Sequence, residues 1–294
     1  MKSLGPVGVR TPRGREWAQR FATRDCRLDS GEIERMRAFF APPPYEQLQD
    51  VDVIAQREAS SKAWYRYNTR PHKVAGYRVV FLSLKAHGEA PGDMTAEQMD
   101  GVADLAERCS FGLIRASHDQ NLLLADVRQG DLYELWRALD VLKLATPNIG
   151  TLTDMICCPG LDFCSLANAT SIPVAKQIQA HFSDLDYLYD LGEIQIKMSG
   201  CMNACGHHHV GHIGILGVDK HGEGGTRSRS AVRRARTRRS VRSSALSVPQ
   251  AAVAGTIQKL IDVYVERRHE EERFVDTVRR IGVEPFQDRV YGES

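Results

Sequence analysis

Four of the seven cysteines in this 294-residue chain form two closely spaced pairs. Five residues separate Cys158 from Cys164, and three separate Cys201 from Cys205. Two such pairs can place four soft thiolates around one site, and these are the ligands that iron–sulfur clusters and some zinc sites share. The pattern therefore indicates a metal centre, whose chemistry depends on the metal that it holds.

The spacing favours an iron–sulfur cluster over zinc. Structural zinc sites usually take their cysteine pairs from tight turns with about two to four residues between ligands, which the longer first gap fits poorly without excluding it. Disulfides are disfavoured because the chain does not open with a secretory signal, which indicates a reducing compartment. Zinc and plain buried thiols stay open as alternatives.

The other three cysteines fit the pattern less well. Cys157 would leave six residues before Cys164, so it is the less favoured ligand of the adjacent pair. Cys26 and Cys109 stand alone, and Cys109 follows an apolar-periodic segment in which a buried cysteine acts as a small hydrophobic residue.

The residues around the two pairs resemble a known family. The segments TDMICCPGLDFCSLANA (153–169) and SGCMNACGHHHVGHIGILG (199–217) resemble the haemoprotein of nitrite and sulfite reductases. The likeness extends upstream to about Trp64, resumes from about Ala251 to Tyr291, and covers roughly two thirds of the chain. Full-length family members are about twice as long and consist of two homologous halves, of which this chain resembles the second.

The resemblance implies a cofactor pair and a reaction. It assigns Cys158, Cys164, Cys201 and Cys205 as ligands of a 4Fe–4S cluster, and Cys205 also as the thiolate that binds the iron of a sirohaem. The family reduces sulfite to sulfide or nitrite to ammonia, with electrons from a flavoprotein or a ferredoxin. The resemblance assigns no catalytic residue here, because the basic residues that hold the substrate anion belong to the other half.

The resemblance also divides the chain into three parts. Residues 1–63 form an N-terminal segment and linker, 64–145 a ferredoxin-like half-domain, and 146–294 an α/β domain for the cluster and sirohaem. The pattern in the second part predicts a strand over 77–85, a helix that starts at a Thr95-x-x-Gln98 capping box, strands over 113–117 and 121–127, and a helix over 131–142. This order is most of a ferredoxin-like unit, and the fold class is α+β. In the helix that starts at the capping box, Met99, Val102 and Leu105 are expected on one apolar face.

In the third part, the pattern predicts two strands around the second cysteine pair. They span 193–198 and 212–218, and they leave this pair on the loop between them. Helices are expected over 171–182, 250–269 and 271–281, the last ending at Gly282. In the second of these helices, five residues form an apolar face: Val253, Ile257, Leu260, Ile261 and Tyr264.

Two polar motifs are interpreted as structural. His207, His208, His209 and His212 follow the last cysteine, where histidines could ligate a metal or deliver protons, but packing and hydrogen bonding are favoured. The segment 115–121, which carries Arg115 and Gln120, resembles a motif that the family uses twice on its sirohaem-facing surface. In the family the earlier copy makes most of the contacts with the macrocycle, so both residues are expected to be structural in this later copy.

One segment departs from the family pattern. Residues 226–244 contain eight arginines and no acid, and without them the formal charge would change from +2 to −6. Such a run could bind nucleic acid or form a solvated loop. Because the flanks match the family and this segment does not, a locally shifted reading frame is the favoured explanation. Residues 1–29, rich in arginine and glycine, do not form a targeting peptide.

The sequence therefore predicts a sulfite or nitrite reductase of the assimilatory type. One alternative is a non-catalytic, cluster-bearing electron-transfer fragment, and another is a nucleic-acid binder that depends on zinc and arginine. We expect a cytoplasmic protein without membrane or nucleic-acid partners, because no apolar run reaches membrane-spanning length.

Overall fold

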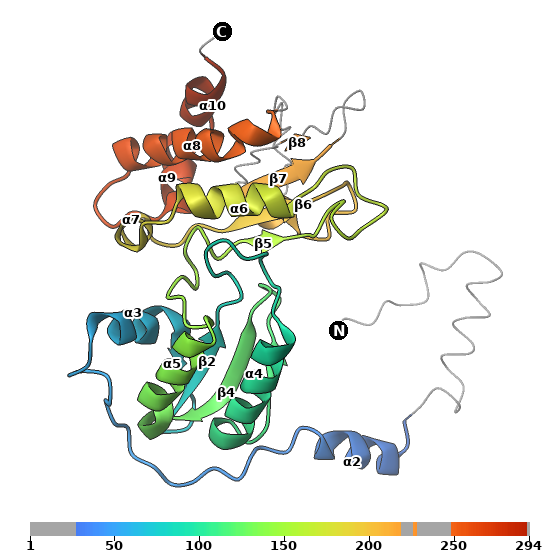
Figure 1. Ribbon diagram of the computed structural model, residues 1–294, viewed down its shortest axis with the longest axis vertical. Coiled ribbons are helices and arrows are strands. Elements are labelled where there is room, and N and C mark those ends of the chain that lie inside the picture. The colour runs from blue at the N-terminus through green and yellow to red at the C-terminus, as the bar shows by residue number, and fades with distance from the viewer. Residues whose placement is uncertain (1–27, 219–225, 228–247, 293–294) are drawn as a thin grey trace, which may run out of the picture. The chain divides into compact units, whose positions relative to one another are not determined.

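The computed structural model describes residues 28–218, 226–227 and 248–292 (Figure 1). The chain divides into two compact units, Met1–Glu46 and Gln47–Ser294. The described part of the first unit contains helix α2 (Ser30–Ala38), in which the side chain of Asp29 caps the N-terminus by accepting a hydrogen bond from Glu32 N. This helix buries none of its residues.

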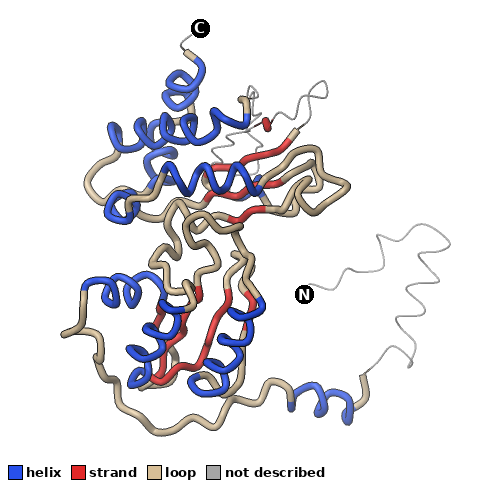
Figure 2. Tube along the Cα trace, in the orientation of Figure 1, coloured by secondary structure: helices blue, strands red, loops and turns tan. Residues whose placement is uncertain are grey.

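The second unit begins with a ferredoxin-like half-domain. Its elements are, in chain order, α3 (Ala59–Asn68), β1 (Thr69–Pro71), β2 (Tyr77–Leu82), α4 (Ala96–Cys109), β3 (Arg115–Ala116), β4 (Leu122–Arg128), the 3₁₀ turn η3 (Gln129–Asp131) and α5 (Leu132–Val141). The strands form an antiparallel sheet of order β1-β2-β4-β3, and α4 and α5 lie along it (Figure 2). The order from β2 to α5 confirms the expected strand–helix–strand–strand–helix unit.

Helix α4 begins where the sequence predicts. The hydroxyl of Thr95 accepts a hydrogen bond from Gln98 N, and the Gln98 side chain accepts one from Thr95 N, which completes a capping box. Val102 and Leu105 are buried as expected. Met99, which was assigned to the same apolar face, is 55% exposed, so this assignment was wrong. Met99 lies in the first turn of the helix, whose described buried residues begin only at Val102.

The remainder of the second unit is an α/β layer. Its elements are β5 (Ile156–Cys157), α6 (Ile172–His181), α7 (Leu185–Leu191), β6 (Ile196–Ser199), the 3₁₀ turn η4 (His208–Val210), β7 (Ile213–Gly217), β8 (Thr226–Arg227), the 3₁₀ turn η5 (Gln250–Ala252), α8 (Val253–Arg267), α9 (Phe274–Ile281) and α10 (Glu284–Tyr291). The sheet order is β5-β6-β7-β8, with β5, β6 and β7 parallel and β8 antiparallel to β7.

Helices α6 and α8 cover one face of this sheet, as Figure 1 shows. The five residues expected on the apolar face of the helix over 250–269 are all buried in the core that α8 shares with α6 and the strands. Burial of apolar side chains is the main favourable contribution to the folding free energy of such a layer. The fold is therefore the mixed α+β arrangement that the sequence predicts.

Several boundaries differ from the predictions. The strand expected over 77–85 ends at Leu82, because the chain turns there and Ser83 N donates a hydrogen bond to Leu144 O instead of continuing the ladder. The strand expected over 193–198 is shorter and lies at 196–199, and the helix expected from 271 starts at Phe274. Beyond Arg227, the arginine-rich segment lies outside the described residues, as does the N-terminal stretch 1–27.

Within the described ranges, no helix has the length and apolar character that crossing a bilayer requires.

Candidate metal centre

The two cysteine pairs follow the carboxyl ends of neighbouring parallel strands. Strand β5 ends at Cys157 and β6 at Ser199, and Cys157 is paired with Met198 in the register. Cys158 N continues the ladder for one more bond, donating to Met198 O at 3.0 Å. Because the ends of adjacent parallel strands meet at one edge of a sheet, Cys158 and Cys201 start their loops side by side.

Two glycines hold these loops in direct contact. A methyl group on Gly200 would lie 2.6 Å from the Cα of Gly160, and one on Gly160 would lie 2.4 Å from Ala169 O. Asn168 N and Ala169 N both donate to Gly200 O, at 2.9 and 3.2 Å. A side chain at Gly200 would therefore force the first cysteine loop away from the second, and one at Gly160 would clash with the main chain of its own loop.

The four candidate ligands differ in burial. Cys158 and Cys201, which directly follow the strands, are 7% and 5% exposed. Cys164 is half-buried, and its N–H donates to Gly160 O at 2.8 Å, which closes the first loop. Cys205 is exposed and lies in a tight turn with the left-handed residues Ala204 (φ 57°) and His207 (φ 52°) on either side. Three of the candidate ligands are therefore shielded from solvent to some degree, and the fourth faces it.

Cys157 points away from this edge. It is buried in the core with Met198, on the face that the helices cover, and burial raises the pKa of its thiol to about 12. A thiol that stays protonated at neutral pH is a poor metal ligand, because the thiolate is the coordinating form. Cys109 is half-buried against the core of the half-domain.

The donor set fits a cluster better than a single ion. The six cysteines within the described ranges are all free thiols. Within the described ranges, no group of three His, Cys, Asp or Glu side chains lies close enough together to hold one metal ion. A cubane is larger than one ion, so its thiolates lie farther apart than the ligands of one zinc. Four cysteine thiolates on two contacting loops are the kind of donor set that such a cluster takes.

His212 has the structural role that the sequence suggests. Its Nδ1 accepts a hydrogen bond from Gln195 N at 3.2 Å, and its ring stacks on Phe274. Burial lowers the pKa of His212, which favours the neutral ring that this hydrogen bond requires. His208 and His209 lie in the turn η4, where their rings contact edge to face.

The polar motif over 115–121 is also structural in its contacts. The guanidinium of Arg115 lies 4.0 Å from the carboxylate of Asp126 and is mostly exposed. The amide of Gln120 forms two hydrogen bonds with the main chain of Cys157, as donor to its carbonyl oxygen at 2.9 Å and acceptor from its N–H at 2.8 Å. No feature of the sequence indicates this link between the half-domain and the first cysteine pair.

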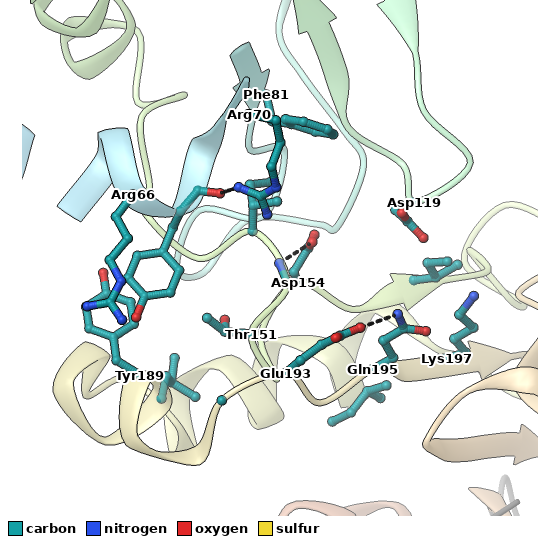
Figure 3. A pocket seen from close by; sticks show the side chains of 17 residues that line it. Arg66, Arg70, Phe81, Asp119, Thr151, Asp154, Tyr189, Glu193, Gln195 and Lys197 are labelled. Carbon is teal, nitrogen blue, oxygen red and sulfur yellow. Dashed lines mark hydrogen bonds between the residues drawn. The ribbon is translucent and has the colours of Figure 1, made fainter. Parts of the chain in front are cut away.

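A separate pocket of about 570 Å³ lies between the half-domain and the α/β layer (Figure 3). None of the four candidate cysteines lines it. Its charged side chains have both signs and therefore specify no class of ligand: Arg66, Arg70 and Lys197 are basic, and Asp119, Asp154 and Glu193 are acidic. This pocket could not be predicted from the sequence, because its walls come from segments far apart in the chain.

Two family models match the chain. Residues 73–142 match the nitrite/sulfite reductase ferredoxin-like half domain, and residues 150–294 match the nitrite and sulphite reductase 4Fe-4S domain. The two matches together cover most of the chain and include all four candidate cysteines.

Individual proteins show the same similarity. The chain is 31% identical to a sulfite reductase [ferredoxin] of Mycolicibacterium paratuberculosis, over 49% of this chain and 27% of that protein. It is also 31% identical to an assimilatory ferredoxin-dependent nitrite reductase of Haloferax mediterranei, over 44% of this chain and 22% of that protein. The matched region thus spans about a quarter of these relatives.

A solved structure agrees with the fold. The structure of the Mycobacterium tuberculosis NirA protein superposes with a TM-score of 0.56 at 22% identity, covering 87% of this chain and 46% of that one. The cofactors of this family are the 4Fe–4S cluster and the sirohaem that the sequence analysis expected. On the two domain matches and the shared fold, the chain belongs to the nitrite and sulfite reductase family.

Proposed function

We propose that this chain supplies the cluster-binding half of an enzyme that reduces sulfite to sulfide or nitrite to ammonia. Cys158, Cys164, Cys201 and Cys205 hold the 4Fe–4S cluster, and Cys205 also binds the iron of sirohaem. The observation that carries the proposal is the contact between the two cysteine loops through Gly160 and Gly200, at the carboxyl edge of β5 and β6.

The surroundings of Cys205 support its double role. Cys205 is exposed, whereas Cys158 and Cys201 are buried, so its thiolate can reach a second group. Both loops also carry large exposed apolar side chains, Phe163 and Leu166 on the first and Met202 on the second. Exposed apolar groups of this kind can be covered by the flat face of a macrocycle. When bound, the two cofactors supply electrons and a metal centre for a reduction that needs several electrons.

The relatives support ferredoxin as the electron donor. Both curated relatives described above are ferredoxin-dependent by name, and one acts on sulfite and the other on nitrite. A flavoprotein donor remains the alternative, and the family match does not choose between the two anions. We also propose a cytoplasmic location and the three-part division at residues 63 and 145.

A non-catalytic, cluster-bearing electron-transfer protein is the second candidate. In such a protein the four cysteines would hold the cluster, but no anion would be reduced.

Anaerobic reconstitution with iron, sulfide and sirohaem, followed by optical and EPR spectroscopy, tests both candidates. The proposal predicts cluster absorption with added sirohaem bands, and oxidation of reduced methyl viologen by sulfite or nitrite once the homologous half is supplied. Cluster absorption without sirohaem bands, and no anion-dependent turnover even with that half present, would favour the electron-transfer protein. A colourless product that retains zinc would contradict both.

A further inference from the structure

The amide of Gln120 occupies the free edge of the strand that leads to the first cysteine pair. Among the described strands, β5 is the terminal one of its sheet, so no described strand pairs with the N–H and the carbonyl oxygen of Cys157 that face away from β6. The side chain of Gln120 satisfies both groups, at 2.8 and 2.9 Å. One primary amide therefore takes the place of a further strand at this residue.

A buried network holds the turn that carries Gln120. The side chain of Lys85 is fully buried, and its ammonium donates to the carbonyl oxygen of Asp119, to Asn121 Oδ1 at 2.9 Å and to Asp154 Oδ1 at 2.9 Å. Asn121 Nδ2 also donates to Asp154 Oδ1 at 2.9 Å. Burial lowers the pKa of Lys85, whereas the charge of Asp154 acts in the opposite direction.

The Lys85 network and the amide of Gln120 both contact the short segment that leads into β5. Asp154 lies three residues before Cys157, and its carboxylate also accepts a hydrogen bond from Gly150 N at 2.9 Å. Figure 3 labels Asp119 and Asp154 among the side chains that line the pocket. The three consecutive residues 119–121 therefore hold the approach to β5 and its last residue together.

This segment contains two adjacent cysteines with opposite orientations. Successive side chains of a strand point to opposite faces, so a shift of one residue along the ladder could bring Cys157 to the position of Cys158, with Ile156 in the position of Cys157. In the structure, Cys157 lies in the core and Cys158 begins the loop that contacts Gly200. The register of β5 thus decides which thiol is available at the sheet edge.

We propose that Gln120 is a positioning residue that fixes the register of β5, so that Cys158 and not Cys157 is presented to the cluster. The inference rests on the proposed function for its second half, the presentation of Cys158 to the cluster. The hydrogen-bonded register itself is a property of the metal-free chain.

Replacement of Gln120 by leucine tests the first half on the metal-free chain. Leucine is similar in size but forms neither hydrogen bond. We expect exchange of the Cys157 amide hydrogen, followed by NMR or mass spectrometry, to become at least roughly tenfold faster. Gln120→Glu keeps the acceptor for this N–H and should retain more of the protection. Unchanged exchange in Gln120→Leu would overturn the inference.

Gln98→Leu is the matched control. The side chain of Gln98 links α4 to the end of α5, because its Nε2 donates a hydrogen bond to Leu142 O at 2.8 Å. No hydrogen bond joins it to β5. The variant should leave exchange of the Cys157 amide close to that of the wild type. If Gln98→Leu accelerates this exchange as much as Gln120→Leu does, general loosening of the half-domain explains the effect and the inference fails.

The reconstituted protein tests the second half. We expect Gln120→Leu to bind less iron than the wild type and to shift the EPR g values and the midpoint potential of the bound cluster, whereas Gln98→Leu does not. Faster amide exchange with an unchanged spectrum and potential would overturn the positioning role. Failure of the wild type itself to bind iron would instead refute the proposed function, while the exchange measurement would still decide the register.

Discussion

At the scale of single residues, the adjacent cysteines Cys157 and Cys158 lie in different environments. Cys157 is buried in the apolar core with a raised pKa, while Cys158 begins the loop at the sheet edge. The sequence favoured Cys158 through its spacing to Cys164 and through the family resemblance. Burial is a property of the folded layer, so the different environments of the two thiols could not be read from the chain.

Alkylation of the metal-free protein by iodoacetamide checks this difference. At pH 8 we expect Cys205, which is exposed, to react rapidly, and Cys157 to be protected because its pKa of about 12 keeps it protonated and burial blocks access. Peptide mass spectrometry gives the rate at each position. In urea the two should react at similar rates, and similar rates in the folded protein would show that Cys157 is not buried as described.

Glu272 gives a residue-scale prediction for the dependence of stability on pH. Its carboxylate accepts hydrogen bonds from Arg280, from His269 N and from Thr277, and these contacts lower its pKa from 4.5 to about 2, with Arg280 as the largest cause. A carboxyl whose pKa is lower in the folded state stabilises the fold above pH 4.5 and loses this contribution as the pH falls towards 2.

The variant Glu272→Gln tests that dependence. We expect its melting temperature to lie below that of the wild type at pH 7, and the difference to shrink steadily below pH 4.5. Thermal unfolding followed by circular dichroism measures both. A difference that stays constant from pH 7 to pH 3 would show that the charge of Glu272 does not contribute.

At the scale of elements, local signals were predictable and contacts between distant segments were not. The capping box at Thr95 and the apolar face of α8 are encoded within one or two turns, and both are confirmed. Met99 was misassigned because periodicity shows the direction of a side chain but not how far the core extends beneath it. Strand β5 has two residues, too few for any alternation to show.

The close contact of Gly160 with Gly200 is the element-scale feature on which the site depends most. The two glycines are forty residues apart in the sequence, and only the pairing of β5 with β6 brings them together. We expect Gly200→Ala to destabilise the protein by about 1–3 kcal/mol, because its methyl group overlaps the main chain of Gly160. Reconstituted Gly200→Ala should also bind less iron than the wild type.

Gly255→Ala is the control for that variant. Gly255 lies in α8, and a methyl group there would meet no atom within 4 Å. It should stabilise the helix by about 0.5–1 kcal/mol and leave iron binding unchanged. Urea unfolding and iron analysis measure both effects. If Gly200→Ala is as stable as Gly255→Ala and binds as much iron, the close contact between the two cysteine loops is not required for stability or for iron binding.

At the scale of the whole molecule, the family and the α+β fold were predictable because the cysteine motif is specific and the half-domain has regular elements. The four-cysteine set stays a prediction from the sequence, now placed on two contacting loops. The link from Gln120 to Cys157 and the mixed-charge pocket of Figure 3 were not predictable, because each joins segments of the half-domain to segments of the α/β layer.

The iron content of single Cys→Ser variants, measured after anaerobic reconstitution, tests the central claim most directly. The account predicts that Cys158→Ser, Cys164→Ser, Cys201→Ser and Cys205→Ser each lose cluster iron and its visible absorption, whereas Cys157→Ser keeps both. An iron content equal to that of the wild type in any of the four variants, or a loss of iron in Cys157→Ser as large as theirs, would contradict it.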